Sequence, residues 1–399
     1  TAVGPSSQVS VPGDAETRDM SGKTIVPGFV DVHAHIWPAW GVHKTQVPGY
    51  LANLAYGVTT SRDPQTSTTD VLTYADQVEA GRMIGPRIYS TGPGIFSSTT
   101  IESQEEANEV VRKYSEYFHT KTLKQYLAGN RQQRQWVLMA AHEQEMMPTT
   151  EGALDMKLDM TQMIDGYPGH EHSFPYMQIY SDVDRLVVET QVTYTPTILV
   201  AYGGPWAENY FYTRENPHGN PKLQRFTPHS ELDERTRRRG DGAGAGPGGW
   251  FMEEEHVFDE QAETLHDIVD AGGRAGVGSH GQLQGLGYHW ELWAMATGGL
   301  SNHEALRLAT ITGADAIGLD QDLGSIASGK LADLIVLRKN PLDSLRHTRT
   351  IRYVMKNGRL YDGKTLDEVY PRSRLLPKMW WQTRGPDGEL PGVGRSGGE

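Results

Sequence analysis

The sequence predicts an α/β fold, specifically a (β/α)8 TIM barrel, on three observations. Short apolar segments alternate with helical segments eight times along the chain. No glycine-rich phosphate loop, the usual mark of an open doubly wound sheet, follows the first strand. That strand ends instead in His33 and His35. Strict alternation implies a parallel sheet, and eight units imply a closed barrel with its active face at the carboxyl ends of the strands.

The elements follow one another in a regular order. Strands are predicted over residues 23–35, 58–64, 86–93, 120–129, 146–152, 169–175, 192–200 and 274–281. Helices are predicted over residues 47–57, 71–83, 103–118, 131–145, 156–167, 182–191, 253–273 and 303–318. The helix at 103 has a plausible N-cap in Ser103, because a serine side chain can accept a hydrogen bond from a free N–H of the first turn. The barrel should therefore span residues 25–319.

Two regions interrupt the alternation. Residues 203–250 form a long insert rich in glycine, proline and aromatic residues, and long loops of this kind are often lids or substrate walls. Its aromatic residues at 202–212 suit either a substrate wall or a small core within the loop. Residues 1–24 and 320–375 are expected to form a small β-sandwich subdomain from both ends of the chain, with a turn at Asn357-Gly358. Residues 376–399 read as a tail.

Composition limits the function further. The chain has 399 residues, of which 37% are hydrophobic and 22% charged, and this suits a globular protein with a large core. A net charge of −13 argues against nucleic acid as a partner. No apolar run approaches the length of about 18 residues that a membrane span needs. With no cysteine, any metal must be held by nitrogen and oxygen atoms.

His33 and His35 predict a metal site. Residues two apart on a strand point to the same face, so the two imidazoles should lie side by side. Such a pair makes a poor hydrophobic core and a good half-site for a divalent metal.

Other strand ends carry polar residues that would meet the pair on one rim. They are Lys124 after the fourth strand, Glu151 after the fifth, His170 and His172 on the sixth, and His280 after the eighth. A protonated lysine would repel a metal, but a neutral one can add carbon dioxide and become an anionic carbamate that bridges two metals. A surface or ion-paired lysine is the alternative.

Two motifs connect the chain to a known family. The run IVPGFVDVHAHIW and the later LATITGADAIGLDQDLGSIASGKLADLIVL closely resemble the metal-dependent amidohydrolase superfamily, in its imidazolonepropionase- and prolidase-like branch. Within it, the chain is similar to amidohydrolase domains that follow a β-propeller in bacterial exported proteins. The resemblance covers nearly the whole chain. It implies metal ligands at His33, His35 and His172, and a lysine at Lys124 that is carbamylated in binuclear members.

Two positions depart from the family's pattern. Its fifth-strand histidine corresponds to Thr149, with Glu151 two residues on as a replacement. Its eighth-strand aspartate, ligand and general base, corresponds to His280, which can bind metal or accept a proton. The number of ions, one or two, and the identity of the base are therefore left open.

The resemblance implies a metal-dependent hydrolase. One or two divalent ions, with zinc the expected metal, would activate water to cleave an amide, imide, carbamate or short peptide, with lactone or phosphotriester hydrolysis as a side activity. Its partner is a small-molecule substrate. A homo-oligomer and a preceding segment or β-propeller are further expectations, and export is favoured over the cytoplasm. A non-catalytic barrel with a degenerate centre and a metal-dependent isomerase or decarboxylase are the alternatives.

Overall fold

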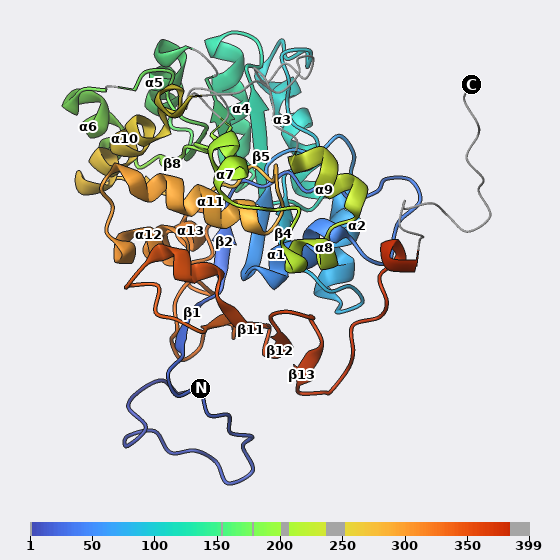
Figure 1. Ribbon diagram of the computed structural model, residues 1–399. Helices are drawn as coiled ribbons and strands as arrows, with labels where there is room; N and C mark the ends of the chain where they lie inside the picture. The colour runs from blue at the N-terminus through green and yellow to red at the C-terminus, as the bar shows by residue number, and fades with distance from the viewer. Residues whose placement is uncertain (1, 153–154, 178, 201–206, 237–251, 384–399) are drawn as a thin grey trace, which may run out of the picture.

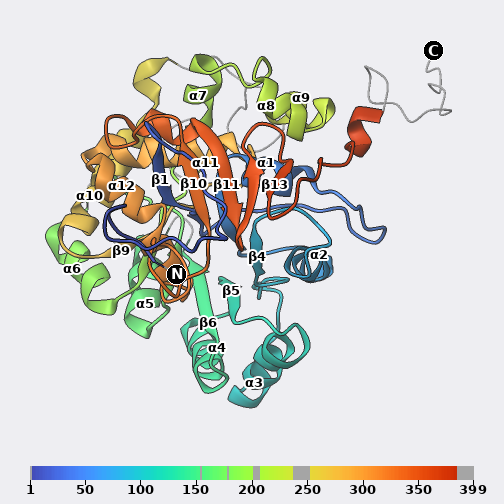
Figure 2. The ribbon, with the colours of Figure 1, turned by 90° about the horizontal axis from the view of Figure 1, so that it is seen from below.

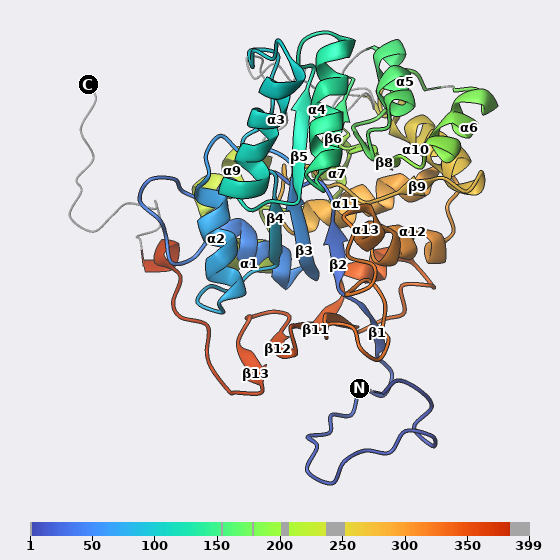
Figure 3. The ribbon, with the colours of Figure 1, turned by 180° about the vertical axis from the view of Figure 1, so that it is seen from behind.

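The body of the protein is a ring of short parallel strands surrounded by helices (Figures 1 and 3). The computed structural model describes residues 2–152, 155–177, 179–200, 207–236 and 252–383. The strands of the ring are β2 (Phe29–Asp31), β3 (Val58–Asp63), β4 (Arg87–Ser90), β5 (Thr122–Tyr126), β6 (Met147–Glu151), β7 (Gly169–Glu171), β8 (Thr193–Thr195) and β9 (Arg274–Ala275). They pair in chain order as β2-β3-β4 and β5-β6-β7-β8-β9.

Two parallel bridges join these sheets at both edges. Ile95, just after β4, pairs with Gln125 of β5, and Ala34, just after β2, pairs with His280 beyond β9. At the second seam the N–H of His280 donates to the carbonyl of His33 at 2.7 Å. The eight strands therefore form a closed ring, and the predicted (β/α)8 barrel is confirmed.

Helices cover the outside of the ring. They are α1 (Pro48–Ala55), α2 (Asp70–Glu79), α3 (Gln104–Arg112), α4 (Arg131–Glu143), α5 (Met156–Asp165), α6 (Ser181–Thr190), α10 (Phe258–Asp270), α11 (Leu286–Met295), α12 (Asn302–Leu308) and α13 (Ile311–Ala316). Short η segments are η1 (Lys113–Tyr117, a π-turn), η2 (Glu253–Glu255), η3 (Ala296–Gly298), η4 (Leu345–Arg349) and η5 (Trp380–Thr383). Ser103 caps α3 as predicted, because its side chain accepts from the N–H of Glu106 at 3.2 Å. None of the helices in the described ranges is long and apolar enough to cross a membrane.

Helix α11 was not predicted from the sequence. All ten of its residues are buried, so its apolar and polar residues do not alternate with the helical period that usually reveals a helix.

The described part of the insert is helical. It contains α7 (Glu208–Arg214), α8 (Pro221–Phe226) and α9 (His229–Thr236), while residues 203–206 and 237–250 lie outside the described residues. Phe211 is buried and stacks on Trp290 of α11, with ring centroids 5.4 Å apart. Of the two interpretations for the aromatic residues around 202–212, Phe211 therefore fits the core. Tyr202 and Trp206 lie outside the described residues.

The two ends of the chain meet in a five-stranded antiparallel sheet, seen from below in Figure 2. Its order is β1 (Thr24–Pro27), β10 (Leu334–Leu337), β11 (Ile351–Lys356), β12 (Arg359–Asp362) and β13 (Glu368–Tyr370). Asn357 and Gly358 both have positive φ in the β11–β12 turn, as the Asn-Gly pair predicts.

The predicted first strand, residues 23–35, is divided between the two sheets. Thr24–Pro27 pairs with β10, whereas Phe29–Asp31 pairs with β3 of the barrel. Gly28 lies at the crossing, and a side chain there would meet Thr59, because a Cβ would lie 2.1 Å from the Thr59 hydroxyl oxygen. The chain thus enters the barrel at Gly28, a few residues later than expected.

Candidate metal centre

The barrel brings the predicted site residues together at the carboxyl ends of its strands. His33 and His35 follow β2, and His280 follows β9. Lys124 lies in β5, Glu151 ends β6, and His172 follows β7. The ring of His33 lies 5.0 Å from the rings of both His172 and His280, measured between centroids. The residues therefore form one constellation on the face where barrel enzymes place their chemistry.

Three of them form a compact nitrogen cluster. His33, His35 and His280 each offer a ring nitrogen, and these atoms all lie within 4.8 Å of one another. The Nε2 atoms of His33 and His35 are 3.3 Å apart. His33 is fully buried and His35 nearly so. Burial also lowers the pKa of His33 and His280 well below the usual value, with nearby positive groups contributing, so both rings are neutral.

The partners of the two Nδ1 atoms decide where the protons lie. His33 Nδ1 lies 2.8 Å from a carboxylate oxygen of Glu171, and His35 Nδ1 lies 3.1 Å from the carbonyl oxygen of Gln65. Both oxygens only accept, so each Nδ1 carries the proton. When both rings are neutral, each Nε2 carries a lone pair, and the two lone pairs face each other. Neutral imidazoles in this arrangement repel unless a cation lies between them, so the cluster fits a divalent metal.

Glu171 is the site residue that the sequence analysis missed. It is buried, and its other carboxylate oxygen accepts from the guanidinium of Arg62 on β3. Burial alone would raise the pKa of Glu171, but Arg62 and Lys124 hold it below its usual value. The available signal was alternation along β7: if His170 points outward, Glu171 must point into the barrel.

His170 does not join the site, contrary to the expectation that it shares a face with His172. Its Nε2 lies 2.9 Å from Asp159 of α5, on the outer side of the barrel. His172 has a positive φ of 74°, just beyond the end of β7. Strand alternation therefore ends at Glu171, and Glu171 and His172 can both serve the site.

Lys124, Glu151 and His172 form a second group beside the cluster. Lys124 Nζ lies 2.8 Å from Glu151 Oε2, and His172 Nε2 lies 3.1 Å from the same oxygen. Burial alone would lower the pKa of Lys124, but Glu151 and Tyr126 raise it overall. Burial alone would raise the pKa of Glu151, but Lys124 and His172 lower it to about 2. In this geometry Lys124 is an ammonium paired with a carboxylate, which is the alternative to the carbamate.

A buried support holds His172. Its Nδ1 lies 2.7 Å from the Thr197 hydroxyl, and Thr197 itself has a positive φ of 49°. The next two N–H groups, of Ile198 and Leu199, donate to the carboxylate of Glu291 on α11 at 2.8 and 2.9 Å. Glu291 therefore fixes the turn that carries Thr197.

Asp31 and Ser279 lie beneath the cluster at the seam of the barrel. The carboxylate of Asp31 accepts from the N–H of Ser279 at 3.0 Å and from its hydroxyl at 2.5 Å. Burial raises the pKa of Asp31 to about 7, although these hydrogen bonds oppose the shift. The pair joins the residues that precede His33 and His280.

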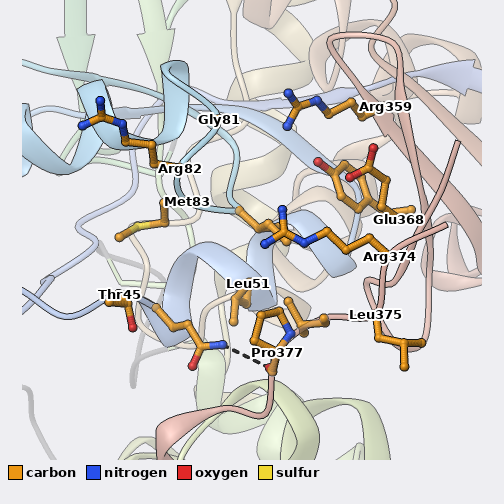
Figure 4. Close-up of a pocket in the computed structure, with 14 residues that line it drawn as sticks. Thr45, Leu51, Gly81, Arg82, Met83, Arg359, Glu368, Arg374, Leu375 and Pro377 are labelled. Atoms are coloured by element: carbon orange, nitrogen blue, oxygen red, sulfur yellow. Dashed lines mark hydrogen bonds between the residues drawn. The ribbon is translucent and has the colours of Figure 1, made fainter. Parts of the chain in front are cut away.

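A separate cavity of about 80 Å³ lies between α1, the segment after α2 and the strands of the small sheet (Figure 4). It is lined by Arg82, Arg359, Arg374 and Glu368 among others, and it contains none of the residues of the histidine cluster. Its mixed charges offer no grouped metal ligands, so we assign the chemistry to the histidine rim.

Comparison with known proteins agrees with this arrangement. Residues 24–361 match the amidohydrolase family. The chain belongs to that family. The match includes the whole barrel and most of the small sheet, and it confirms the resemblance drawn from the two motifs.

Individual relatives match over the whole fold or over short segments. Phenylurea hydrolase B superposes with a TM-score of 0.67 at 19% identity, covering 94% of this chain and 93% of that one. A Xaa-Pro dipeptidase with bound methionine superposes with a TM-score of 0.65 at 19% identity, covering 89% and 90%. At such identities the likeness shows the fold.

Sequence matches to curated proteins are short. A 5-methylthioadenosine/S-adenosylhomocysteine deaminase of Teredinibacter turnerae is 42% identical over 62 residues, 16% of this chain and 14% of that protein. A 5'-deoxyadenosine deaminase of Methanobrevibacter smithii is 51% identical over 41 residues, 10% of this chain and 9% of that protein.

Family membership defines the general chemistry. The protein is a metal-dependent hydrolase of carbon–nitrogen bonds, and its family acts on small molecules. The family typically uses a divalent metal, and the His33–His35–His280 cluster is a candidate site for it.

Proposed function

We propose that the protein hydrolyses an amide, imide, carbamate or short peptide bond with a zinc ion held by His33, His35 and His280. The observation that carries this proposal is the cluster of ring nitrogens of His33, His35 and His280, in which the Nε2 atoms of His33 and His35 are 3.3 Å apart. A divalent ion bound there would supply Lewis acidity, because it lowers the pKa of water and polarises a carbonyl.

The surrounding residues have distinct roles in this proposal. His172 donates its Nε2–H to Glu151, because a carboxylate only accepts. Its Nδ1 lies 2.7 Å from the Thr197 hydroxyl, which itself donates to the carbonyl of Pro196. The Lys124 ammonium has three N–H groups, so those that Glu151 does not take can donate on the side where negative charge develops on the substrate oxygen, while His172 and Glu151 hold Lys124 in place. His280 stands in the position of the family's eighth-strand base; as a neutral imidazole with one lone pair it can hold the ion, or accept the proton of the attacking water and return it to the leaving nitrogen, and not both at once.

A two-ion form is the second candidate for this centre. It would use Glu151 and His172 as ligands and a carbamylated Lys124 as the bridge. The ion pair between Lys124 and Glu151, at 2.8 Å, favours the one-ion form.

The first test is elemental analysis of the purified protein, together with hydrolysis of a panel of simple amides and carbamates. About one zinc per chain supports the one-ion form. About two, with one added carbon dioxide on Lys124 by mass spectrometry, supports the carbamate form. No metal after purification without chelators and after reconstitution would overturn the proposal in favour of a non-catalytic barrel.

Substitution sharpens this test. His33→Ala and His35→Ala should each lose the metal and reduce hydrolysis to background, since each removes one of the facing nitrogens. His142→Ala, an exposed histidine on α4, is the matched control and should keep both. Full metal and full turnover in either site variant would contradict the assignment.

A further inference from the structure

Aromatic side chains border one quadrant of the proposed centre. They come from the carboxyl ends of adjacent strands: Trp37 after β2, Phe96 after β4 and Tyr126 at the end of β5. We infer that these residues, here called the aromatic wall, bind a flat aromatic group of the substrate. This inference rests on the proposed function and names its substrate class.

Trp37 lies directly against a proposed metal ligand. Its ring stacks on that of His35, with centroids 5.7 Å apart and planes inclined by 23°. Yet 53% of Trp37 remains exposed to solvent. A large apolar ring beside a reactive centre, packed on one side and open on the other, is typical of a surface that a ligand covers.

Phe96 and Tyr126 form a second open stack. Their rings are 4.7 Å apart and nearly parallel, at 11°, and Phe96 is 39% exposed. Gly94 permits this stack, because a Cβ at that position would lie 2.7 Å from the Tyr126 ring. Lys124 Nζ lies 4.3 Å from the centre of the same ring. The stack therefore reaches the second group of the site.

Gln65, after β3, connects the two parts of the wall. Its carbonyl accepts from His35, and its side-chain Cγ lies 3.2 Å from the place of a Cβ on Gly94. Gln65 thus contacts His35, on which Trp37 stacks, and approaches Gly94, which precedes Phe96 by two residues. Offset stacking on neutral rings favours an uncharged aromatic group over an aliphatic one of equal size.

Packing within the protein does not explain these rings. Phe211, by comparison, is 2% exposed and lies in the core. Trp37 and Phe96, in contrast, are exposed at the carboxyl ends of the strands, on the face that the substrate must approach.

The test compares substrates that differ in one group. For the zinc-loaded protein, kcat/KM should be higher for acetanilide than for N-cyclohexylacetamide. The ratio of the two should fall about tenfold in Trp37→Ala and in Phe96→Ala, the size of a lost aromatic pair. Tyr117→Ala, a 72% exposed aromatic in η1, should leave the ratio unchanged. An equal preference in the unaltered protein, or an unchanged ratio in both wall variants, would overturn the inference.

A binding measurement separates this inference from the proposed function. Saturation-transfer NMR with acetanilide needs no turnover. Transfer to the phenyl protons that weakens in Trp37→Ala and not in Tyr117→Ala supports the aromatic wall even if no amide is hydrolysed, in which case the proposed function alone fails. Transfer that is absent, or equal in all three proteins, overturns the wall.

Discussion

His33 and His172 lie on the same rim, 5.0 Å apart between ring centroids, but they turn opposite ring nitrogens toward a carboxylate. His33 gives its Nδ1–H to Glu171 and keeps a lone pair on Nε2. His172 directs Nε2 at the carboxylate of Glu151, which requires a proton there. The first ring is thus prepared to hold a cation and the second to donate a hydrogen bond. The comparison teaches that the partner of each imidazole, rather than its spacing in the sequence, sets its role.

Of the substitutions that test this comparison, the largest effect is expected at the residue that accepts from His172. Glu151→Gln removes the charge that pairs with Lys124 and the acceptor that fixes the His172 proton. Turnover should fall about 10²-fold, while the zinc content stays near that of the unaltered protein. Steady-state kinetics and elemental analysis on the same sample check this. If the zinc were lost together with the activity, Glu151 would be a metal ligand. The different roles assigned to His33 and His172 would then be wrong.

The sequence predicted which residues lie on the rim of the barrel better than it predicted how their side chains are arranged there. Strand order and spacing were enough to bring His33, Lys124, His172 and His280 together, because all parallel strands of a barrel end on one face. Glu171 was missed because alternation was counted from His172, and the positive φ at that residue shifts the count. A single positive φ, such as that of His172, cannot be recognised from the periodicity of apolar residues in the sequence.

A smaller effect is expected at the holding side. Glu171→Gln keeps an acceptor for His33 but removes the charge shared with Arg62. We expect zinc affinity, measured by competition with a chelator, to weaken about 10- to 100-fold, as for other residues that orient metal-binding histidines. Glu145→Gln, on an exposed glutamate, is the control. Unchanged affinity would mean that the barrel alone orients His33.

The smallest effect concerns the support of His172. Burial raises the pKa of Glu291 from 4.5 to about 8, although the N–H donors of Ile198 and Leu199 lower it. The folded protein therefore binds a proton that the unfolded chain has released, and the unfolding free energy falls as the pH rises between these values. Glu291→Gln should remove this fall, because glutamine does not titrate. Denaturant titrations at several pH values measure it, and parallel pH profiles would contradict the prediction.

The contact between the first and last strands, which closes the barrel, also determines when the metal site can form during synthesis and folding. Asp31 and Ser279 are 248 positions apart, yet their hydrogen bonds join the two segments that carry His33 and His280. During synthesis the early histidines emerge long before their partner exists. The three-nitrogen cluster can be completed only when the last strand docks on the first. Metal binding would then show that the barrel has closed. A chain whose folding stops before the last strand pairs with the first would lack His280 as the third ligand.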